Sequence, residues 1–329
     1  MEPLIDSYGR THSYLRLSVT DRCNLRCVYC MPPEGILRKD REEILSFEEI
    51  FRLTGLFADM GIRKVRLTGG EPLLRCGVER LVACIAAVPG IETVGMTTNG
   101  VLLKDHLEAL QKAGLKLLNI SLDTLRPERF GDITLRQNFS QVLEGLEAAL
   151  KLGFAPVKLN VVVIRGANAD ELLDFVEFVR DRPVSVRFIE YMPFRANNWR
   201  QDRFMPFREM KSVIEEKYPL VPLDNPDDPS RVAREFSIQG FRGSVGFITS
   251  ISEHFCGNCN RLRLSADGCM QLCLHNPGEL NLRHLLRAGC PDEEIARLLR
   301  NALAAKPYEH HALESPCGGR DRTMIEIGG

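Results

Sequence analysis

The 329-residue chain has almost no net charge and no long apolar run. Its 43 Lys and Arg residues balance 44 Asp and Glu residues, for a formal charge of −1 at pH 7, which argues against a general nucleic-acid binder. No apolar run approaches the roughly 20 residues that cross a bilayer, so we expect no membrane partner. No Gly-rich loop followed by Lys-Ser or Lys-Thr occurs, which argues against a P-loop nucleotide site.

The start of the chain also lacks the charged and apolar regions of a secretory signal peptide. Eleven cysteines without such a signal indicate a reducing compartment and metal binding. We therefore expect a cytoplasmic protein, although a trimmed organellar presequence would leave no trace in this sequence. With 44% apolar and 26% charged residues, the chain can bury a large core and form one large domain or two.

Three cysteines share one short segment after a strand-like run. Cys23, Cys27 and Cys30 have the spacing C-x3-C-x2-C. Structural zinc usually takes four ligands in two C-x2-C pairs, and disulfides suit small secreted chains. Three thiolates on one loop can instead bind three irons of a 4Fe-4S cluster and leave the fourth iron open. We interpret this triplet as the site of such a cluster, with an open iron at which chemistry occurs.

A second cysteine triplet lies in the last quarter of the chain. Cys256, Cys259 and Cys273 have the spacing C-x2-C-x13-C. From spacing alone two interpretations stay open: a zinc ribbon with Cys269 or His275 as fourth ligand, or a second cluster whose open iron meets the substrate. The other cysteines share no spacing and are interpreted as ordinary thiols: Cys76, Cys84, Cys269, Cys290 and Cys317.

The first two thirds of the chain repeat one unit, a β-branched run followed by an amphipathic helix. Six strands are predicted near Leu15–Val19, Lys64–Leu67, Thr93–Thr97, Leu117–Ser121, Val157–Ile164 and Val184–Ile189. Helices are predicted near Ser46–Met60, Val78–Ala87, Lys104–Ala113, Ser140–Leu152 and Asp170–Arg180. The fold class is therefore α/β, a six-stranded parallel partial β/α barrel. Active sites of such barrels lie at the carboxyl ends of the strands.

The pattern changes after the sixth unit. Residues 222–229 are rich in proline and aspartate and are typical of a linker. Runs at 235–238 and 244–250 predict antiparallel strands, and helices are predicted at Leu282–Arg287 and Glu293–Leu303. We divide the chain into a partial barrel at 6–195, a connecting segment at 196–229 and a C-terminal α+β region at 230–329. The last region carries the second triplet, and we expect it to close the open side of the barrel.

Polar residues follow three of the predicted strands. Thr68-Gly69-Gly70-Glu71-Pro72 offers paired glycines for close approach of a ligand and a carboxylate for an amine. Thr97–Gly100 and Ser121–Asp123 stand at equivalent positions, although each alone is also typical of a turn or cap. Their shared place at strand ends favours one ligand site.

These features together resemble radical S-adenosylmethionine (SAM) enzymes. The resemblance rests on the first triplet with Tyr29, on the Thr68–Pro72 segment and on the six-unit barrel. The second triplet with Asn260-Arg261-Leu262-Arg263, and the terminal Gly328-Gly329, make the chain similar to the GTP 3′,8-cyclase family of molybdenum cofactor biosynthesis. The resemblance runs from about Asp6 to the last residue.

The resemblance implies two 4Fe-4S clusters and SAM as cofactors. The first triplet would bind the cluster that chelates SAM, and the second the cluster whose open iron binds the guanine base. The 6–195 region would be the radical SAM barrel. Four positions match the family's SAM pocket: Tyr29, Gly70, Ser121 and Met192.

The resemblance also implies a GTP site and a C-terminal tail that reaches into the active site. The matching GTP contacts are Arg16, Arg66, Thr97, Lys158, Arg261, Leu262 and Arg263. Arginine pairs with phosphate through two parallel hydrogen bonds, and a cation on an inward face needs an anionic partner. We assign direct roles in the reaction to Arg16, Arg66, Lys158, Gly328 and Gly329. Without the resemblance, the two terminal glycines would be a frayed chain end.

The implied reaction is a radical cyclisation of GTP. An adenosyl radical takes hydrogen from the 3′ ribose carbon, and the sugar radical attacks carbon 8 of guanine. The implied partners are an external electron donor and a downstream cyclic pyranopterin monophosphate synthase; a homodimer also stays open. Two other functions remain: a different radical SAM enzyme with an auxiliary cluster, and a two-cluster electron carrier that is no enzyme.

Overall fold

The computed structural model describes residues 1–223, 232–275, 280–310 and 323–328. Its centre is a run of six parallel strands in chain order, with each strand paired to the next. The strands are β1 (Tyr14–Ser18), β2 (Lys64–Thr68), β3 (Thr93–Thr98), β4 (Leu117–Ser121), β5 (Val157–Val163) and β6 (Val184–Glu190). All six predicted strands are thus confirmed to within one residue at either end.

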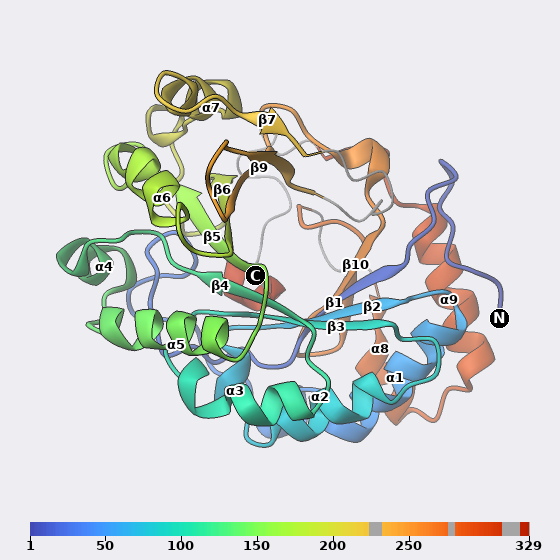
Figure 1. Ribbon diagram of the computed structural model, residues 1–329. Coiled ribbons are helices and arrows are strands. Elements are labelled where there is room, and N and C mark those ends of the chain that lie inside the picture. The colour runs from blue at the N-terminus through green and yellow to red at the C-terminus, as the bar shows by residue number, and fades with distance from the viewer. Residues whose placement is uncertain (224–231, 276–279, 311–322, 329) are drawn as a thin grey trace.

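Helices cover the outer side of this curved sheet (Figure 1). They are α1 (Phe47–Asp59), α2 (Val78–Ala86), α3 (Leu103–Lys112), α4 (Pro127–Thr134), α5 (Phe139–Lys151) and α6 (Leu172–Phe178). The first begins at the predicted capping box, in which Ser46 accepts from Glu49 N and Glu49 accepts from Ser46 N. The C-terminal region adds α8 (Leu282–Arg287), α9 (Asp292–Ala304) and α10 (Met324–Ile327).

The C-terminal region extends the sheet at both of its edges. Strand β10 (Arg261–Leu264) pairs in parallel with β1, and β9 (Ser244–Ile248) pairs in parallel with β6. Antiparallel strands follow on either side: β11 (Cys269–Gln271), β12 (Leu280–Asn281), β8 (Arg234–Ser237) and β7 (Val221–Pro222). Among the described strands β12 and β7 form the two ends, so the barrel is partial, as predicted. The C-terminal strands lengthen its curve from both sides.

Three of the described helices are absent from the sequence prediction: α4, α7 and the short α10. Helix α4 begins at Pro127, which suits a first helical position because proline needs no hydrogen-bond acceptor there. Helix α7 (Phe207–Glu215) lies inside the expected connecting segment and buries Phe207, Met210 and Ile214 along one face. The proline-rich part of that segment at 224–229 lies outside the described residues.

The strands alternate between an apolar outer face and a polar inner face. On β1, Leu15 and Leu17 join the core under the helices, while Arg16 points to the concave side. On β2, Val65 and Leu67 do the same, while Arg66 points inward. Among the described residues no helix is both long and apolar enough to cross a membrane. The concave side is thus left for polar side chains.

Candidate functional site

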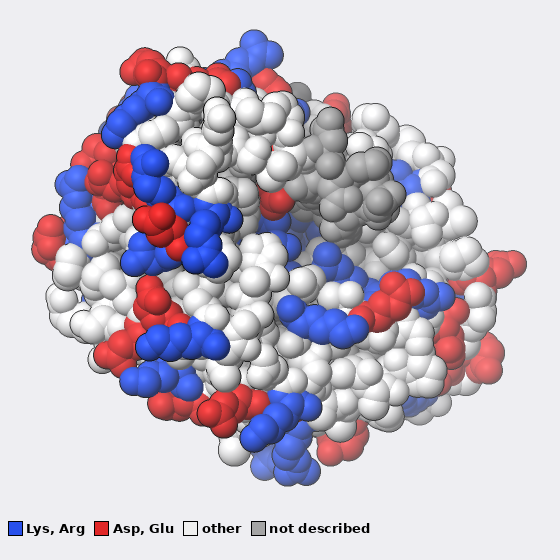
Figure 2. Space-filling view, in the orientation of Figure 1, with Lys and Arg blue, Asp and Glu red and all other residues white. Residues whose placement is uncertain are grey.

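A single cavity on the concave side is lined by both cysteine triplets. Figure 2 shows a hollow on this face with Lys and Arg side chains visible inside it. Its lining comes from β1 to β6, from the loop after β1 and from the C-terminal region. It includes all six predicted cluster ligands, Cys23, Cys27, Cys30, Cys256, Cys259 and Cys273. Residues more than 200 positions apart in the chain therefore face one space.

The first triplet lies on a loop held against α4 and β2. Arg26 N donates to Thr134 O at 2.9 Å, and Val28 N donates to Ile133 O at 3.0 Å. The three thiols form no disulfide. Burial raises the pKa of Cys23 to about 11 and raises those of Cys27 and Cys30 further. Three half-buried free thiols on one loop fit the thiolate set of a cluster that brings its own positive charge.

The second triplet has a different electrostatic environment. Burial alone would raise the pKa of Cys259, but the positive charges of Arg261 and Lys306 outweigh it and lower the pKa to about 7. Cys256 and Cys273 face the same cavity as free thiols. This donor set also fits a cluster.

Of the two residues considered as a fourth zinc ligand, His275 faces the cavity and Cys269 does not. His275 lines the cavity and stacks on Phe194, with 5.5 Å between ring centroids. Cys269 lies buried in β11 and is not among the lining residues. Within the described residues, no three His, Cys, Asp or Glu side chains converge on a single metal ion. In a 4Fe-4S cube each thiolate binds a different iron, so its ligands need not converge on one point.

The four residues matched to a SAM pocket all line this cavity: Tyr29, Gly70, Ser121 and Met192. Gly70 stands where the end of β2 meets the triplet loop, and a Cβ there would lie 2.2 Å from Arg22 O. The neighbouring Glu71 N donates to the same carbonyl at 2.7 Å. Glycine at position 70 therefore lets the cysteine loop pack directly on the strand end.

Glu71 does not have the expected place beside a ligand amine. It is fully buried and outside the lining, and its carboxylate accepts from Thr98 Oγ1 and Asn99 N, each at 2.7 Å, and from Leu73 N at 3.1 Å. Burial raises the pKa of Glu71 to about 7 despite these hydrogen bonds. The side chain joins the end of β2 to the end of β3.

Tyr29 connects the triplet loop to the barrel through Asp123. Its hydroxyl donates to Asp123 Oδ2 at 2.7 Å, and Val162 N donates to Asp123 Oδ1 at 2.8 Å. Burial raises the pKa of Asp123 to about 6. Each carboxylate oxygen of Asp123 thus accepts one hydrogen bond, Oδ2 from the triplet loop and Oδ1 from β5.

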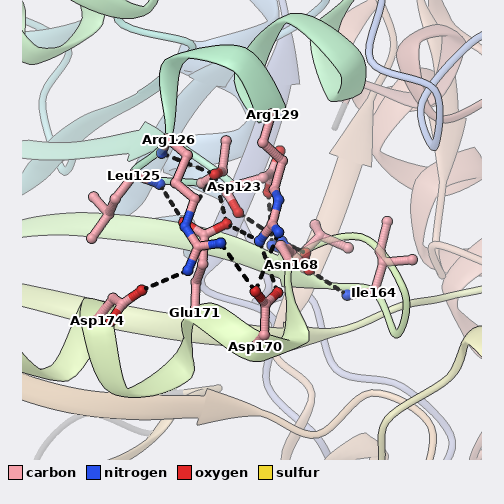
Figure 3. Close-up of polar contacts among 11 residues, drawn as sticks. Asp123, Leu125, Arg126, Arg129, Ile164, Asn168, Asp170, Glu171 and Asp174 are labelled. Carbon is pink, nitrogen blue, oxygen red and sulfur yellow. Dashed lines mark hydrogen bonds and ion pairs between the residues drawn. The ribbon is translucent and has the colours of Figure 1, made fainter.

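A polar network behind Asp123 fixes the segment that carries it (Figure 3). Asn168 Nδ2 donates to Asp123 O at 2.7 Å. The carboxylate of Glu171, which is fully buried, accepts from Thr124 Oγ1 at 2.7 Å, Leu125 N at 2.8 Å and Arg129 Nη1 at 2.5 Å. The loop after β4 is therefore tied to α4 and α6 through one buried acid.

We expect Arg129→Met to lower the free energy of unfolding by about 2 to 3 kcal/mol, because it leaves the buried Glu171 carboxylate without its cation. Arg126→Met is a matched control, since Arg126 pairs only with the exposed Asp170 and Asp174 among the contacts in Figure 3. Its cost should stay below about 1 kcal/mol. Urea unfolding of both variants measures the difference, and equal costs would contradict a buried role for Glu171.

Among the described residues, seven cations line the cavity, and Asp123 is the one carboxylate in the lining. The cations are Arg16, Lys64, Arg66, Lys158, Arg187, Arg261 and Arg263. In register, Arg16 lies between Arg263 on β10 and Arg66 on β2. Arg66 is 4% exposed and donates to Met96 O at 2.9 Å and Asn119 Oδ1 at 3.0 Å. This excess of positive charge suits a ligand with several negative charges.

The cations also act on Tyr14, which lines the cavity between them. Burial alone would raise its pKa, but the charges of Arg66, Arg16 and Lys64 outweigh this and lower the pKa to about 7. Arg66 Nε donates to the Tyr14 hydroxyl at 2.6 Å. Gly95 makes room for the Arg66 guanidinium, since a Cβ there would lie 3.0 Å from Arg66 Nη2.

The structure brings together six of the seven positions matched to GTP contacts: Arg16, Arg66, Thr97, Lys158, Arg261 and Arg263. Leu262 differs, because it follows Arg261 on β10 and packs in the core on the other face of the sheet. Tyr14, Lys64, Asn119, Asn160 and Arg187 also line the cavity and were missed. The alternation of each strand marks the first four, since each is two residues from, or paired in register with, a predicted contact, and Arg187 is paired in register with Asn160. The role of each residue stays a prediction.

The C-terminal tail lies inside the curve of the sheet, near the label C in Figure 1. Helix α10 begins at a capping box of Thr323 and Glu326, and its Met324 lines the cavity. Gly328 has φ +87° and is packed so closely that a Cβ would lie 2.6 Å from Ser18 Cβ and 3.2 Å from Thr68 Oγ1. It is thus seated at the carboxyl ends of β1 and β2. Gly329 lies outside the described residues.

Two family models match the chain. Residues 17–179 match the Radical SAM superfamily, and residues 184–312 match Molybdenum Cofactor Synthesis C. A solved structure of *Streptococcus suis* SuiB bound to S-adenosylmethionine has a TM-score of 0.61 at 15% identity, over 97% of this chain and 73% of that one. At this identity the likeness concerns the fold alone.

Curated relatives match almost the whole chain. Molybdenum cofactor biosynthesis protein 1 of *Bos taurus* is 49% identical over 98% of this chain and 51% of its own length, so the chain spans about half of that relative. The GTP 3′,8-cyclase of *Alkaliphilus metalliredigens* is 46% identical over 98% of this chain and 99% of its own length. Radical SAM membership implies one 4Fe-4S cluster and SAM as cofactors. The chain belongs to the GTP 3′,8-cyclase family of the radical SAM superfamily.

Proposed function

We propose that the protein cyclises GTP to 3′,8-cyclo-7,8-dihydro-GTP, the first step of molybdenum cofactor biosynthesis. The observation that carries this proposal is one cavity shared by two cysteine triplets and seven cations. One triplet suffices to bind the cofactor of a radical SAM enzyme. A second triplet in the same cavity, close in sequence to Arg261 and Arg263, adds a place to hold a nucleotide.

Each triplet has its own role in this proposal. Cys23, Cys27 and Cys30 would hold the cluster that binds SAM, and Cys256, Cys259 and Cys273 would hold a second cluster toward the guanine base. When bound, the first cluster and SAM supply one-electron chemistry that removes a hydrogen atom from a substrate carbon. Tyr29, fixed by Asp123, keeps the first loop in place.

The cations would bind the triphosphate and orient the ribose. Arg16, Arg66 and Lys158 project from three strands of the barrel, so a triphosphate held by them would have a defined position. Arg66 is buried and Arg16 and Lys158 are half-buried, which limits competing water and strengthens each charge interaction. We assign positioning to these side chains, because radical cyclisation needs orientation and exclusion of water more than a general base.

The terminal glycines complete the proposed site. Gly328 is packed against Ser18 and Thr68, at the strand ends where the first triplet loop begins and where Gly70 follows. Residues without side chains can occupy this narrow space beside two ligands. We also propose that the chain divides into a barrel at 6–195, a connecting segment at 196–229 and a C-terminal region at 230–329.

Lys158→Met should lower kcat/KM for GTP by about 10- to 100-fold, the loss of one charge-assisted hydrogen bond. Burial, and then the charge of Arg187, lower the pKa of Lys158 to about 8. The ammonium is present below that pKa and lost as pH rises through it, so kcat/KM of the parent should fall above about pH 8. The pH profile of Lys158→Met should lack this fall; a profile with the same decline would assign it to another group.

The experiment that tests the function is anaerobic reconstitution with iron and sulfide, followed by incubation with SAM, dithionite and GTP. We expect 5′-deoxyadenosine and cyclised GTP in equal amounts, identified by mass spectrometry. Deoxyadenosine without any change in GTP would indicate a different radical SAM enzyme. No SAM cleavage at all would indicate an electron carrier.

The proposed reaction also needs an electron donor and an enzyme that consumes its product. An external donor must supply the electron, and a cyclic pyranopterin monophosphate synthase would consume the product. The eleven cysteines and the absence of a secretory signal in the sequence support action in the cytoplasm. Whether two copies form a homodimer is a matter for light scattering of the reconstituted protein.

A further inference from the structure

We propose that Lys306 is a positioning residue for the second triplet, acting as a fixed positive charge and hydrogen-bond donor to Cys259. The inference rests on the proposed second cluster and goes beyond it. It states that Lys306, held in place by His12, makes that cluster easier to reduce. Neither residue lines the cavity or is among the positions matched to ligand contacts.

Lys306 is an unusual lysine because it is buried, with 4% of its surface exposed. Its ammonium lies 2.8 Å from His12 Nε2, 3.2 Å from Arg261 O and 3.8 Å from Cys259 Sγ. These three directions use all three ammonium protons. A buried ammonium without a negative partner is costly, and the Cys259 thiolate is the anionic group in direct contact with it.

His12 fixes the direction of this ammonium. The imidazole is fully buried, and its Nδ1 lies 3.0 Å from Arg10 O, which can only accept. Nδ1 therefore carries the proton, and Nε2 is left as the acceptor for Lys306. A neutral imidazole in this tautomer orients a cation without cancelling its charge.

The N-terminal segment also fixes the backbone around the triplet. Arg10 donates to Cys256 O and to Tyr308 O, each at 2.7 Å, and to Pro307 O at 3.0 Å. Its Nε donates to Asp6 Oδ2 at 2.6 Å, so the Asp6 carboxylate, which also lies 3.8 Å from His12 Nε2, is paired with Arg10. Lys306 and the loop of Cys256 and Cys259 are thus both tied to the N-terminal segment.

The two triplets consequently have opposite surroundings. Near the first triplet the carboxylates of Asp123 and Glu71 outnumber one cation, Arg26. Near the second, Lys306, Arg261 and Arg263 outnumber one carboxylate, Glu309, among the residues that the structure describes. A hydrogen bond and a positive charge at a ligand sulfur stabilise the reduced form of a cluster, which carries one more negative charge. Lys306 should therefore raise the reduction potential at the second site.

The test uses the full chain with Cys23→Ala, Cys27→Ala and Cys30→Ala, so that only the second triplet can bind a cluster. Into this background we would introduce Lys306→Met, Lys306→Gln or Lys306→Arg, with Lys112→Met as a control at an exposed lysine. After anaerobic reconstitution, iron and sulfide per chain and the midpoint potential are measured, the latter by redox titration followed by electron paramagnetic resonance.

Both neutral variants should shift the midpoint potential to a more negative value. Lys306→Arg should restore most of the parent value, and Lys112→Met should leave it unchanged. If Lys306→Met does not fold, Lys306→Gln, which keeps a polar head, decides the question. Loss of iron in the neutral variants with retention in Lys306→Arg would also support the inference, since charge is what those variants lack.

Failure of the proposed second cluster and failure of the inference about Lys306 give different results. A background protein that binds no iron would refute the proposed second cluster itself. A background protein that binds iron, with the same midpoint potential in parent and neutral variants, would overturn the inference about Lys306 and leave the proposed function intact.

Discussion

Replacing Gly328 by alanine is expected to abolish GTP cyclisation while both triplets still bind iron. Gly328 has φ +87°, and an added Cβ would lie 2.6 Å from Ser18 Cβ. Neither the strand end nor the tail can yield without moving the other, so the tail should leave the site. Iron content, SAM binding and product formation measured on the same preparation distinguish loss of the tail from loss of a cluster.

The control for Gly328→Ala is Gly289→Ala. Gly289 has a similar φ of +74°, but a Cβ there would meet nothing within 4 Å. Alanine at this position therefore carries the backbone strain of a left-handed residue, about 1 kcal/mol, without the steric clash. Deletion of Gly328 and Gly329 should give the same loss of cyclisation. Full turnover by the truncated chain would remove the tail from the mechanism.

The second large effect is expected for Gly70→Ala, which should prevent the first triplet from binding its cluster. A Cβ at this position would lie 2.2 Å from Arg22 O and 3.1 Å from Cys23 N, both backbone atoms. The loop would have to lift off the end of β2, and this would displace the first cysteine ligand. We expect iron content to fall by about half, from two clusters to one, and SAM cleavage to be lost.

Gly55→Ala serves as the matched control for Gly70→Ala. Gly55 lies within α1, and a Cβ there would meet nothing within 4 Å. Alanine favours a helix interior over glycine by about 1 kcal/mol, so this variant should unfold at higher denaturant. Normal SAM cleavage in Gly70→Ala would show that the loop can adapt and that the close approach is not required.

The barrel could be predicted because its units are locally complete. The run Val157–Val163 contains four valines, and Ser46 with Glu49 marks a helix start with only four residues. Helix α7 was missed because proline and charged residues surround its apolar stripe. Strand β10 was missed because only pairing with β1, far away in sequence, makes Arg261–Leu264 a strand.

The site, too, contains residues that local sequence identifies and residues that only the folded sheet reveals. The spacing of the cysteines identifies them, because spacing is a local property. The full set of cations could not be found without the sheet, since Lys64 and Arg187 resemble ordinary surface charges in a linear sequence. Lys306 is an extreme case: its neighbours, Ala305 and Pro307, give no sign that it is buried beside Cys259.

The pairing of β10 with β1 has a consequence for how the protein is made. One edge of β1 stays open until residues 261–264 have left the ribosome, when most of the chain already exists. An open parallel edge can pair with other chains, and contacts this distant in sequence form slowly. We therefore expect the pairing of β10 with β1 to be a late step of folding, so that Arg261 and Arg263, which β10 carries, reach the cavity only after the six central strands exist.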